Sequence, residues 1–139
     1  MSRFILSVGL LGAISLCLQA QDVVDSQLSR ITELMVNDNY EKTHDYEFDW
    51  LEDDESDNYY IRLSQYYNYK IIAVCDQDCE DIDMKIYDEN GKLLDEDVAE
   101  DDVPIVELTP RTTGRYRVYL KMYDCDVEPC KVGIAVYGR

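Results

Sequence analysis

Residues 81–94 read DIDMKIYDENGKLL, and this stretch decides the fold. Hydrophobic side chains at Ile82, Met84 and Ile86 alternate with polar ones, which is the period of a β-strand with one buried face. Asn90-Gly91 follows, and this dipeptide is the strongest short-range signal of a tight β-hairpin turn. The stretch therefore predicts two antiparallel strands joined by a two-residue turn.

The period of two continues on both sides of this hairpin. It predicts further strands near residues 46–50, 59–63, 103–108, 116–122 and 131–137, and a continuous apolar run at 69–75 that is typical of a strand covered on both faces. The connections are too short for crossover helices, so the strands must pair mainly antiparallel. About eight short strands predict an all-β fold, a jelly-roll-like antiparallel β-sandwich. The acidic patch at 95–102 is expected to be an exposed loop between strands.

A different period precedes the strands. The apolar residues there recur at helical spacing and are Val23, Val24, Leu28, Ile31, Leu34 and Met35. This stripe predicts one short amphipathic helix from about residue 22 to residue 37. The helix would dock its stripe on the rest of the chain, which is the favoured use, or bind a partner.

The first twenty residues are typical of a secretory signal peptide. Arg3 is followed by an apolar run over residues 4–18, and Ala20 supplies a small residue at the expected cleavage site. A membrane anchor is disfavoured because the run is short of the roughly twenty residues that span a bilayer. A lipoprotein with a modified Cys17 is disfavoured because bulky Leu16 precedes that cysteine.

The predicted organisation is a signal peptide over 1–20, a helix and connector over 21–45, and a β-sandwich domain over 46–139. The predicted location is secreted or periplasmic, with no transmembrane segment after cleavage.

The chain is strongly acidic. After cleavage, 12 Lys and Arg would stand against 30 Asp and Glu in 119 residues, and the basic residues are scattered singly along the sequence. Such a charge disfavours nucleic acids and anionic membranes as partners. It is typical of a solvated surface or, as an alternative, of a cation-binding surface.

Four cysteines remain after cleavage: Cys75, Cys79, Cys125 and Cys130. An even number in an exported chain predicts disulfides, with three possible connectivities. The local pairs Cys75–Cys79 and Cys125–Cys130 are favoured because each would pin one loop at the end of a strand. A four-thiolate zinc site is the alternative, but it usually has tighter C-x-x-C spacing and occurs in a reducing compartment.

Residues 81–92 and 108–118 resemble the bacterial pre-peptidase C-terminal domain family. The shared features are a D-x-D strand with its D-x-x-G hairpin, and a proline and T-G-x-Y-x-V strand further on; the resemblance extends over roughly 46–137. It implies a jelly-roll-like β-sandwich that accompanies secreted peptidases, sometimes binds calcium, and serves as an accessory or binding module. The 139 residues include no peptidase domain, and the cysteine pairs are not part of the family pattern.

One cluster of acidic residues is a candidate calcium site. Its members lie within eight positions and are Asp76, Asp78, Glu80, Asp81 and Asp83. Calcium prefers six to eight hard oxygen ligands, and carboxylates supply them. No EF-hand pattern is present, so a solvated acidic loop held by a disulfide is the alternative.

No catalytic constellation is recognisable. His44 is the single histidine, and it has no free cysteine or evident serine partner with which to act, so we expect a surface residue and no enzyme activity. Five tyrosines lie close together in the sequence: Tyr59, Tyr60, Tyr66, Tyr67 and Tyr69. Such a cluster is typical either of half-buried strands or of a surface that stacks on sugars or on a partner.

The predicted function is a non-catalytic secreted binding or accessory module, with or without calcium, whose partner is another exported protein or a cell-surface component. The alternative is a structural or accessory subunit of an envelope assembly that docks through its N-terminal helix. A carbohydrate-binding module is a further alternative.

Overall fold

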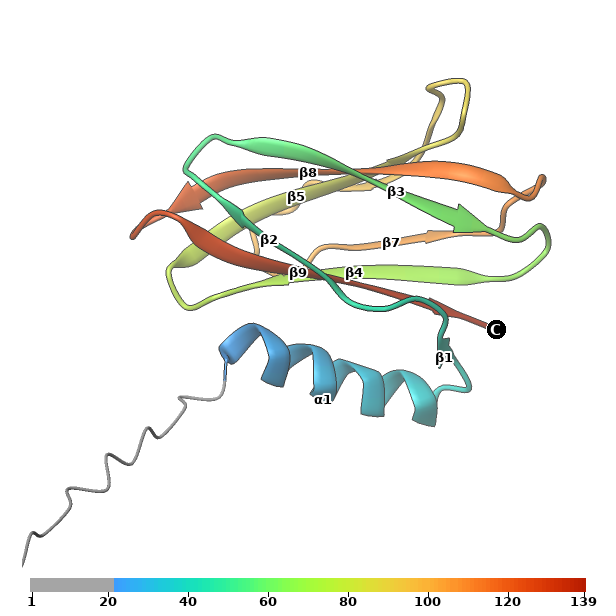
Figure 1. Cartoon of the computed structure of the whole chain (residues 1–139), viewed down its shortest axis with the longest axis horizontal. Helices are drawn as coiled ribbons and strands as arrows, with labels where there is room; N and C mark the ends of the chain where they lie inside the picture. The colour runs from blue at the N-terminus through green and yellow to red at the C-terminus, as the bar shows by residue number, and fades with distance from the viewer. Residues whose placement is uncertain (1–21) are drawn as a thin grey trace, which may run out of the picture.

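A computed structural model of the chain describes residues 22–139. The predicted signal peptide and Cys17 lie outside these residues. The described part forms one helix and nine strands (Figure 1). The elements are α1 (Val23–Asn37), β1 (Glu41–Lys42), β2 (Glu47–Leu51), β3 (Ser56–Leu63), β4 (Tyr69–Cys75), β5 (Cys79–Tyr87), β6 (Leu93–Asp97), β7 (Ile105–Leu108), β8 (Gly114–Cys125) and β9 (Cys130–Gly138).

The strands form two sheets that face each other. Sheet A has the order β1-β9-β4-β7, and β2 also pairs with β9; sheet B has the order β3-β8-β5-β6. Every strand pair is antiparallel. Strands 5 and 6, 4 and 7, 3 and 8, and 2 and 9 therefore pair in nested order around the predicted hairpin, which is the arrangement of a jelly roll. The predicted fold class is confirmed.

The predicted hairpin is at the centre of this nesting, but its connection is longer than the predicted two-residue turn: it extends from Asp88 to Lys92, and Gly91 N donates a hydrogen bond to the Asp88 carbonyl at 3.1 Å. Gly91 has a φ of +80°, a conformation that glycine adopts without steric cost. The Asp88 carboxylate accepts hydrogen bonds from the backbone nitrogens of Asn90 and Lys92, both at 2.9 Å. Asp88 therefore serves the turn.

The main core lies between the sheets. The alternating residues of β5 and β8 that the sequence pattern singles out are all buried there: Ile82, Met84, Ile86, Val118, Leu120 and Met122. Strand β4 is buried on both faces, as predicted, because Ile71 and Ala73 face this core while Ile72 and Val74 face α1.

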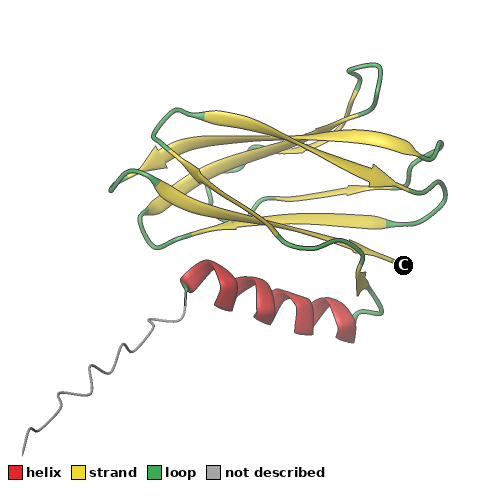
Figure 2. Cartoon of the chain, in the orientation of Figure 1, coloured by secondary structure: helices red, strands yellow, loops and turns green. Residues whose placement is uncertain are grey.

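Helix α1 covers the outer face of sheet A (Figure 2). Asp22 caps it by accepting a hydrogen bond from the Val24 nitrogen at 3.0 Å. Val24 and Leu28 are fully buried against β4 and β9, and a Cβ on Gly133 of β9 would lie only 2.7 Å from Val24 Cγ1. Glycine at this position therefore allows the helix to approach the sheet closely. The favoured prediction, that the helix docks on its own domain, is confirmed.

The acidic patch at 95–102 is only partly a loop, and the expectation of a wholly exposed loop was wrong. Asp95 and Asp97 belong to β6, and their carboxylates accept hydrogen bonds from Glu107 N at 2.8 Å and Ile105 N at 2.9 Å, respectively. These two side chains satisfy edge-facing backbone donors of β7 and connect the two sheets along this side. Composition alone reveals the charge of such residues but not their use as backbone acceptors.

Both disulfides are the predicted local pairs, Cys75–Cys79 and Cys125–Cys130, with Cα–Cα distances of 5.9 and 6.0 Å. Cys79 and Cys125 lie opposite each other in the pairing of β5 with β8, so both bridges are at the same end of the sandwich. The four sulfurs form two disulfides and are not thiolates, which contradicts the alternative of a four-thiolate zinc site.

Candidate functional site

The predicted calcium ligands do not converge on one point. The Asp76 carboxylate accepts hydrogen bonds from the backbone nitrogens of Asp78, at 3.0 Å, and Lys131, at 2.7 Å. It connects the β4–β5 turn to the start of β9. The Asp78 carbonyl in turn accepts a hydrogen bond from Asp126 N at 2.8 Å. The Asp76 carboxylate therefore acts as an acceptor that holds the β4–β5 turn against the start of β9.

Glu80 joins a different group, the acidic trio Glu80, Asp124 and Asp126, whose carboxylate oxygens lie within 4.8 Å of one another on the surface. A hydrogen bond with Asp126 and the negative charges of Asp126 and Asp124 raise the pKa of Glu80. The sequence reasoning missed Asp124 and Asp126. Their positions on either side of Cys125 were the available signal, because a second disulfide loop was predicted there.

Asp81 and Asp83 lie further along β5. Asp81 is paired in register with Asp124, and its Oδ1 is buried without a hydrogen-bond partner. Burial, followed by the charges of Glu100, Asp101 and Asp124, raises the pKa of Asp81. Asp83 is only 8% exposed, and burial is the main reason that its pKa is raised as well.

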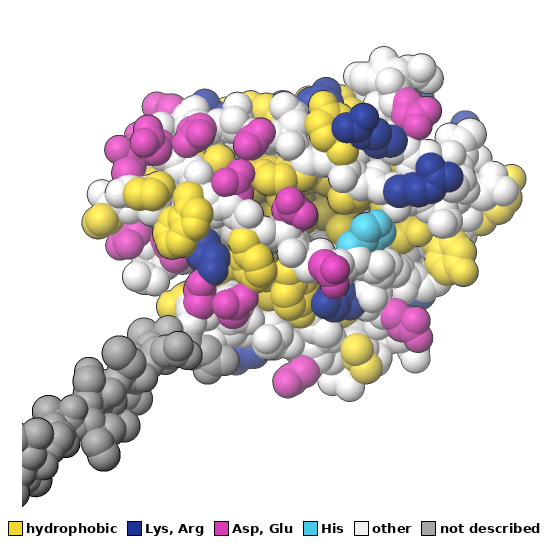
Figure 3. Space-filling model, in the orientation of Figure 1, with side chains coloured by type: hydrophobic (Ala, Val, Ile, Leu, Met, Phe, Trp, Pro, Cys, Tyr) yellow, Lys and Arg dark blue, Asp and Glu magenta, His cyan; other side chains and the backbone are white. Residues whose placement is uncertain are grey.

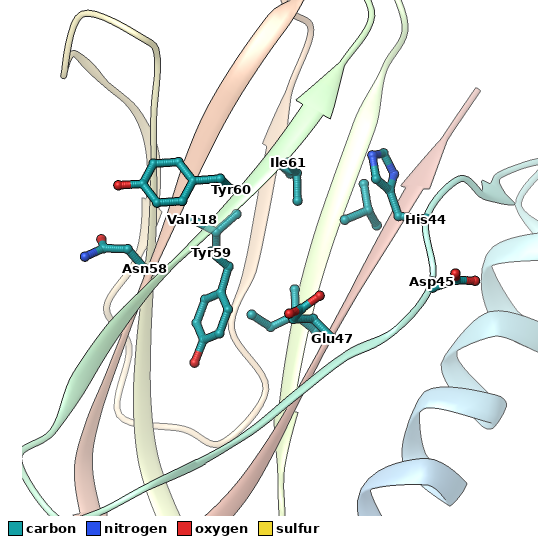
Figure 4. Close-up of a pocket in the computed structure, with 10 residues that line it drawn as sticks. His44, Asp45, Glu47, Asn58, Tyr59, Tyr60, Ile61 and Val118 are labelled. Carbon is teal, nitrogen blue, oxygen red and sulfur yellow. The ribbon is translucent and has the colours of Figure 1, made fainter.

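The opposite side of the sandwich has a hollow between β2 and β3 (Figure 4). Its volume is about 460 Å³, and it is lined by His44, Asp45, Glu47, Asn58, Tyr59, Tyr60, Ile61, Val118, Ile134 and Val136. Core residues Val118, Ile134 and Val136 form the floor, and Tyr59 and Ile61 of β3 form one wall. Figure 3 shows an apolar depression on this face with acidic side chains and the histidine beside it. We call this the β2–β3 hollow.

His44 closes one end of the β2–β3 hollow. One ring nitrogen, Nδ1, is 2.8 Å from Thr43 Oγ1, and the other, Nε2, is 2.9 Å from the Arg62 carbonyl oxygen. The ring therefore connects the chain before β2 to the end of β3. His44 is a surface residue, as predicted, but it is partly covered and makes two hydrogen bonds that join these segments.

Tyr59 stands at the mouth of the hollow and donates a hydrogen bond from its hydroxyl to Asp49 Oδ2 at 2.7 Å. Burial, this hydrogen bond and the nearby charges of Asp49, Asp57 and Glu47 raise the pKa of Tyr59 well above its ordinary value. The hydroxyl is therefore a permanent donor that faces a negatively charged rim.

The edge of β3 beside the hollow is open. Asn58 N donates a hydrogen bond to Asp57 Oδ1 at 2.7 Å, and the Arg62 carbonyl oxygen is hydrogen-bonded to the His44 ring. The backbone groups of Asn58 and Arg62 therefore point away from β8. In an antiparallel pair, alternate residues point the same way, which places the N–H and C=O of Tyr60 on the open edge. The seam at β6 and β7 differs, because aspartate side chains bridge it.

The predicted tyrosine cluster is divided between core and surface. Tyr69 is buried and Tyr59 half-buried, whereas Tyr60, Tyr66 and Tyr67 are exposed. The tyrosines therefore do not form one aromatic surface.

No protein-family model matches the chain, and no curated protein matches it. In residues 22–139, no helix combines the length and the apolar character that crossing a bilayer requires.

Proposed function

We propose that this protein is an exported, non-catalytic binding module that holds an extended, positively charged segment of another exported or cell-surface protein in the β2–β3 hollow. The observation that carries the proposal is a hollow of about 460 Å³ directly beside the open edge of β3. Two disulfides are typical of proteins that work in an oxidising compartment, which supports export.

The shape of the hollow favours a strand as ligand. A strand added along β3 would form backbone hydrogen bonds with the outward-facing groups of Tyr60, as in recognition by β-augmentation. Alternate side chains of that strand would point to the apolar floor of Val118, Ile134 and Val136. The volume is within the range of about 300–1,000 Å³ that is usual for ligand sites.

The charge around the hollow favours a basic segment. Asp45 and Glu47 line it, Asp49 and Asp57 stand next to Tyr59, and its lining residues include no Lys or Arg. The formal net charge of the whole chain is −17. A segment that alternates basic and apolar residues would thus be attracted by the rim and buried on the floor.

Binding can be tested with three fluorescein-labelled ten-residue peptides, which alternate Lys with Val, Lys with Gly, or Glu with Val. We expect the Lys–Val peptide to bind more tightly than the equally charged Lys–Gly peptide, because only valine can use the apolar floor. Glu47→Lys should weaken Lys–Val binding by about tenfold or more. Glu33→Lys, the same charge change on the exposed side of α1, is the matched control and should leave the affinity within about twofold.

Two results would contradict the proposal. Equal affinity for the Lys–Val and Lys–Gly peptides would show attraction by net charge alone. Equal weakening by Glu47→Lys and Glu33→Lys would place the peptide outside the hollow. Melting curves of both variants establish that they are folded.

The second part of the proposal is that calcium stabilises the disulfide end. The three carboxylates of the acidic trio and the unpartnered oxygen of Asp81, which is paired in register with Asp124, support it. Calcium at ten times its dissociation constant would add about 1.4 kcal/mol to the free energy of unfolding. The melting temperature should then rise in calcium relative to chelator and the shift should disappear in Asp126→Asn but persist in Glu33→Gln. An unchanged melting temperature would refute this part.

The resemblance to pre-peptidase C-terminal domains agrees with an accessory role and stays a prediction. The alternative of an envelope subunit that docks through α1 has less support, because Val24 and Leu28 are already buried in the domain.

A further inference from the structure

The outer face of sheet B gathers many of the basic residues of this acidic protein, beside the acidic residues Asp83 and Glu96 of the same face. Strand alternation directs five of the twelve Lys and Arg of residues 22–139 to this face: Arg62, Lys85, Arg115, Arg117 and Lys121. No helix of the described part covers it, since α1 packs on sheet A. These basic residues are scattered singly along the sequence, and strand pairing brings them together on one face.

Two of the arginines are held by tyrosine rings. Arg115 Cζ lies 3.9 Å from the centre of the Tyr60 ring, and Arg117 Cζ lies 4.1 Å from the centre of the Tyr87 ring. Arg117 Nη1 also donates a hydrogen bond to Asn58 Oδ1 at 2.8 Å. Contact with an aromatic ring restrains an arginine side chain and does not use its N–H donors.

These arginines have no carboxylate partner. Among the described residues, no ion pair within 4.0 Å includes Arg62, Arg115 or Arg117, although the chain has 30 Asp and Glu. Arg62 and Arg115 are direct register partners of β3 and β8. Like charges directly opposite each other on a sheet repel, and an anion placed between them would offset this repulsion.

Two carboxylates border the arginines and make hydrogen bonds to backbone nitrogens. Asp88 accepts hydrogen bonds from two nitrogens of its own turn, and Glu89 Oε1 accepts one from Arg115 N at 2.9 Å. Both residues line a second hollow of about 410 Å³, together with Tyr60, Gly91, Arg115 and Arg117. Among the described residues, no ion pair within 4.0 Å joins Arg115 or Arg117 to either carboxylate, so the guanidinium edges can bind an anion from outside the protein.

We propose that Arg62, Arg115 and Arg117, with Tyr60 and Tyr87, form a binding site for a polysaccharide that carries carboxylates. We call it the arginine–tyrosine surface. The fork of a guanidinium matches a carboxylate with two parallel hydrogen bonds. Sugar hydroxyls would find partners in Asn58 and in the tyrosine hydroxyls, and the apolar face of a sugar ring can pack on an exposed aromatic ring.

The positive charge is too confined for a nucleic acid. Lys85 is paired with Glu96 at 3.7 Å and Lys121 with Asp54 at 3.9 Å, so the cations beyond the three arginines are already neutralised. A nucleic acid requires a longer row of phosphate contacts. One or two acidic sugar units match the three free arginines better.

The test uses polygalacturonate, its fully methyl-esterified form and poly-L-glutamate, measured by calorimetry in 0.15 M NaCl. The protein should bind polygalacturonate and not the ester, which has the same backbone without the charge. Arg115→Gln and Arg117→Gln should each weaken binding by about tenfold, and the double variant by about a hundredfold. Arg30→Gln, on an exposed position of α1, is the control for loss of one positive charge and should change the affinity by less than about twofold.

Arg115→Lys separates geometry from charge, because it keeps the charge and loses the fork, and we expect it to weaken binding nearly as much as Arg115→Gln. Melting temperatures establish that each variant is folded. The proposal is overturned if polygalacturonate does not bind, if poly-L-glutamate binds equally well, or if Arg30→Gln weakens binding as much as Arg115→Gln.

Discussion

Replacement of Leu28 by alanine tests how strongly α1 is bound to the sandwich. Leu28 is fully buried in the second core, between the helix and sheet A. Truncation of a buried leucine to alanine costs about 2–5 kcal/mol, and the value rises with the volume of the cavity that remains. We expect about 3 kcal/mol here, because the helix is a single outer layer that can partly settle toward the sheet. For a domain of this size that loss corresponds to a fall in melting temperature of about 12 °C.

Leu34→Ala is the matched control on the same helix. Leu34 is 63% exposed, so the substitution makes the same change in helix propensity without making a cavity. Its effect on the free energy of unfolding should stay within about 0.5 kcal/mol. The difference between the two variants measures the docking of α1.

Gly133→Ala tests the contact between α1 and sheet A by a change in β9 of the sheet. The added methyl would lie 2.7 Å from Val24 Cγ1 and 2.9 Å from Leu28 Cδ1, which is too close for either. Overpacking of this kind costs about 1–3 kcal/mol. In the double variant with Leu28→Ala, part of the space is vacated, so the combined loss should be smaller than the sum by about 0.5 kcal/mol or more.

Urea unfolding followed by circular dichroism and by tyrosine fluorescence gives the free energies of all four variants. The reasoning about the helix is refuted if Leu28→Ala and Leu34→Ala destabilise equally. It is also refuted if the losses of Leu28→Ala and Gly133→Ala add up, because residues in direct contact should be coupled.

Three further predictions concern other parts of the fold. Joint replacement of Cys75 and Cys79 by alanine should lower the free energy of unfolding by about 2 kcal/mol, which is the chain-entropy value for so short a loop. A clearly smaller loss, measured by urea unfolding of the oxidised proteins, would contradict this prediction. Asp81→Asn, measured in chelator, should raise the melting temperature at pH 7 and flatten its pH dependence. The raised pKa of Asp81 means that the folded state binds its proton more tightly, so wild-type stability falls as pH rises from the ordinary value of 3.8 through the folded pKa; a less stable variant at pH 7 would contradict this. Tyr137→Phe should cost about 1 kcal/mol through loss of the 2.9 Å hydrogen bond to Thr32, and unchanged stability would show that the bond contributes nothing.

Most of the fold was predictable from short stretches. Ile82, Met84 and Ile86 lie on one buried face of β5, as their alternation predicts, and Gly91 has a positive φ in the longer connection between β5 and β6. The buried run of β4 and the start of α1 were equally local. Only the two-residue strand β1, Glu41–Lys42, lay in the predicted connector, because its sequence has no strand period and its pairing with β9 comes from proximity.

The candidate sites were less predictable because they combine residues that are distant in sequence. The predicted calcium residues were chosen by nearness along the chain, whereas the structure brings Glu80 next to Asp124 and Asp126 through the pairing of β5 with β8. The β2–β3 hollow depends on the divergence of two strands that belong to different sheets. No periodicity within either strand reports that divergence.

The amino-acid pattern by itself determined the order of the strands along the chain, the hairpin around Asn90-Gly91, the amphipathic helix and the acidity of the surface. These properties follow from side-chain period, local backbone preference and composition, which act over a few residues. The tertiary structure alone decided that α1 packs on sheet A, which residues line the β2–β3 hollow, and that Arg62, Arg115 and Arg117 gather on one face of an acidic protein. Each of these depends on strand register and on the facing of two sheets, which are set by contacts between residues far apart in sequence.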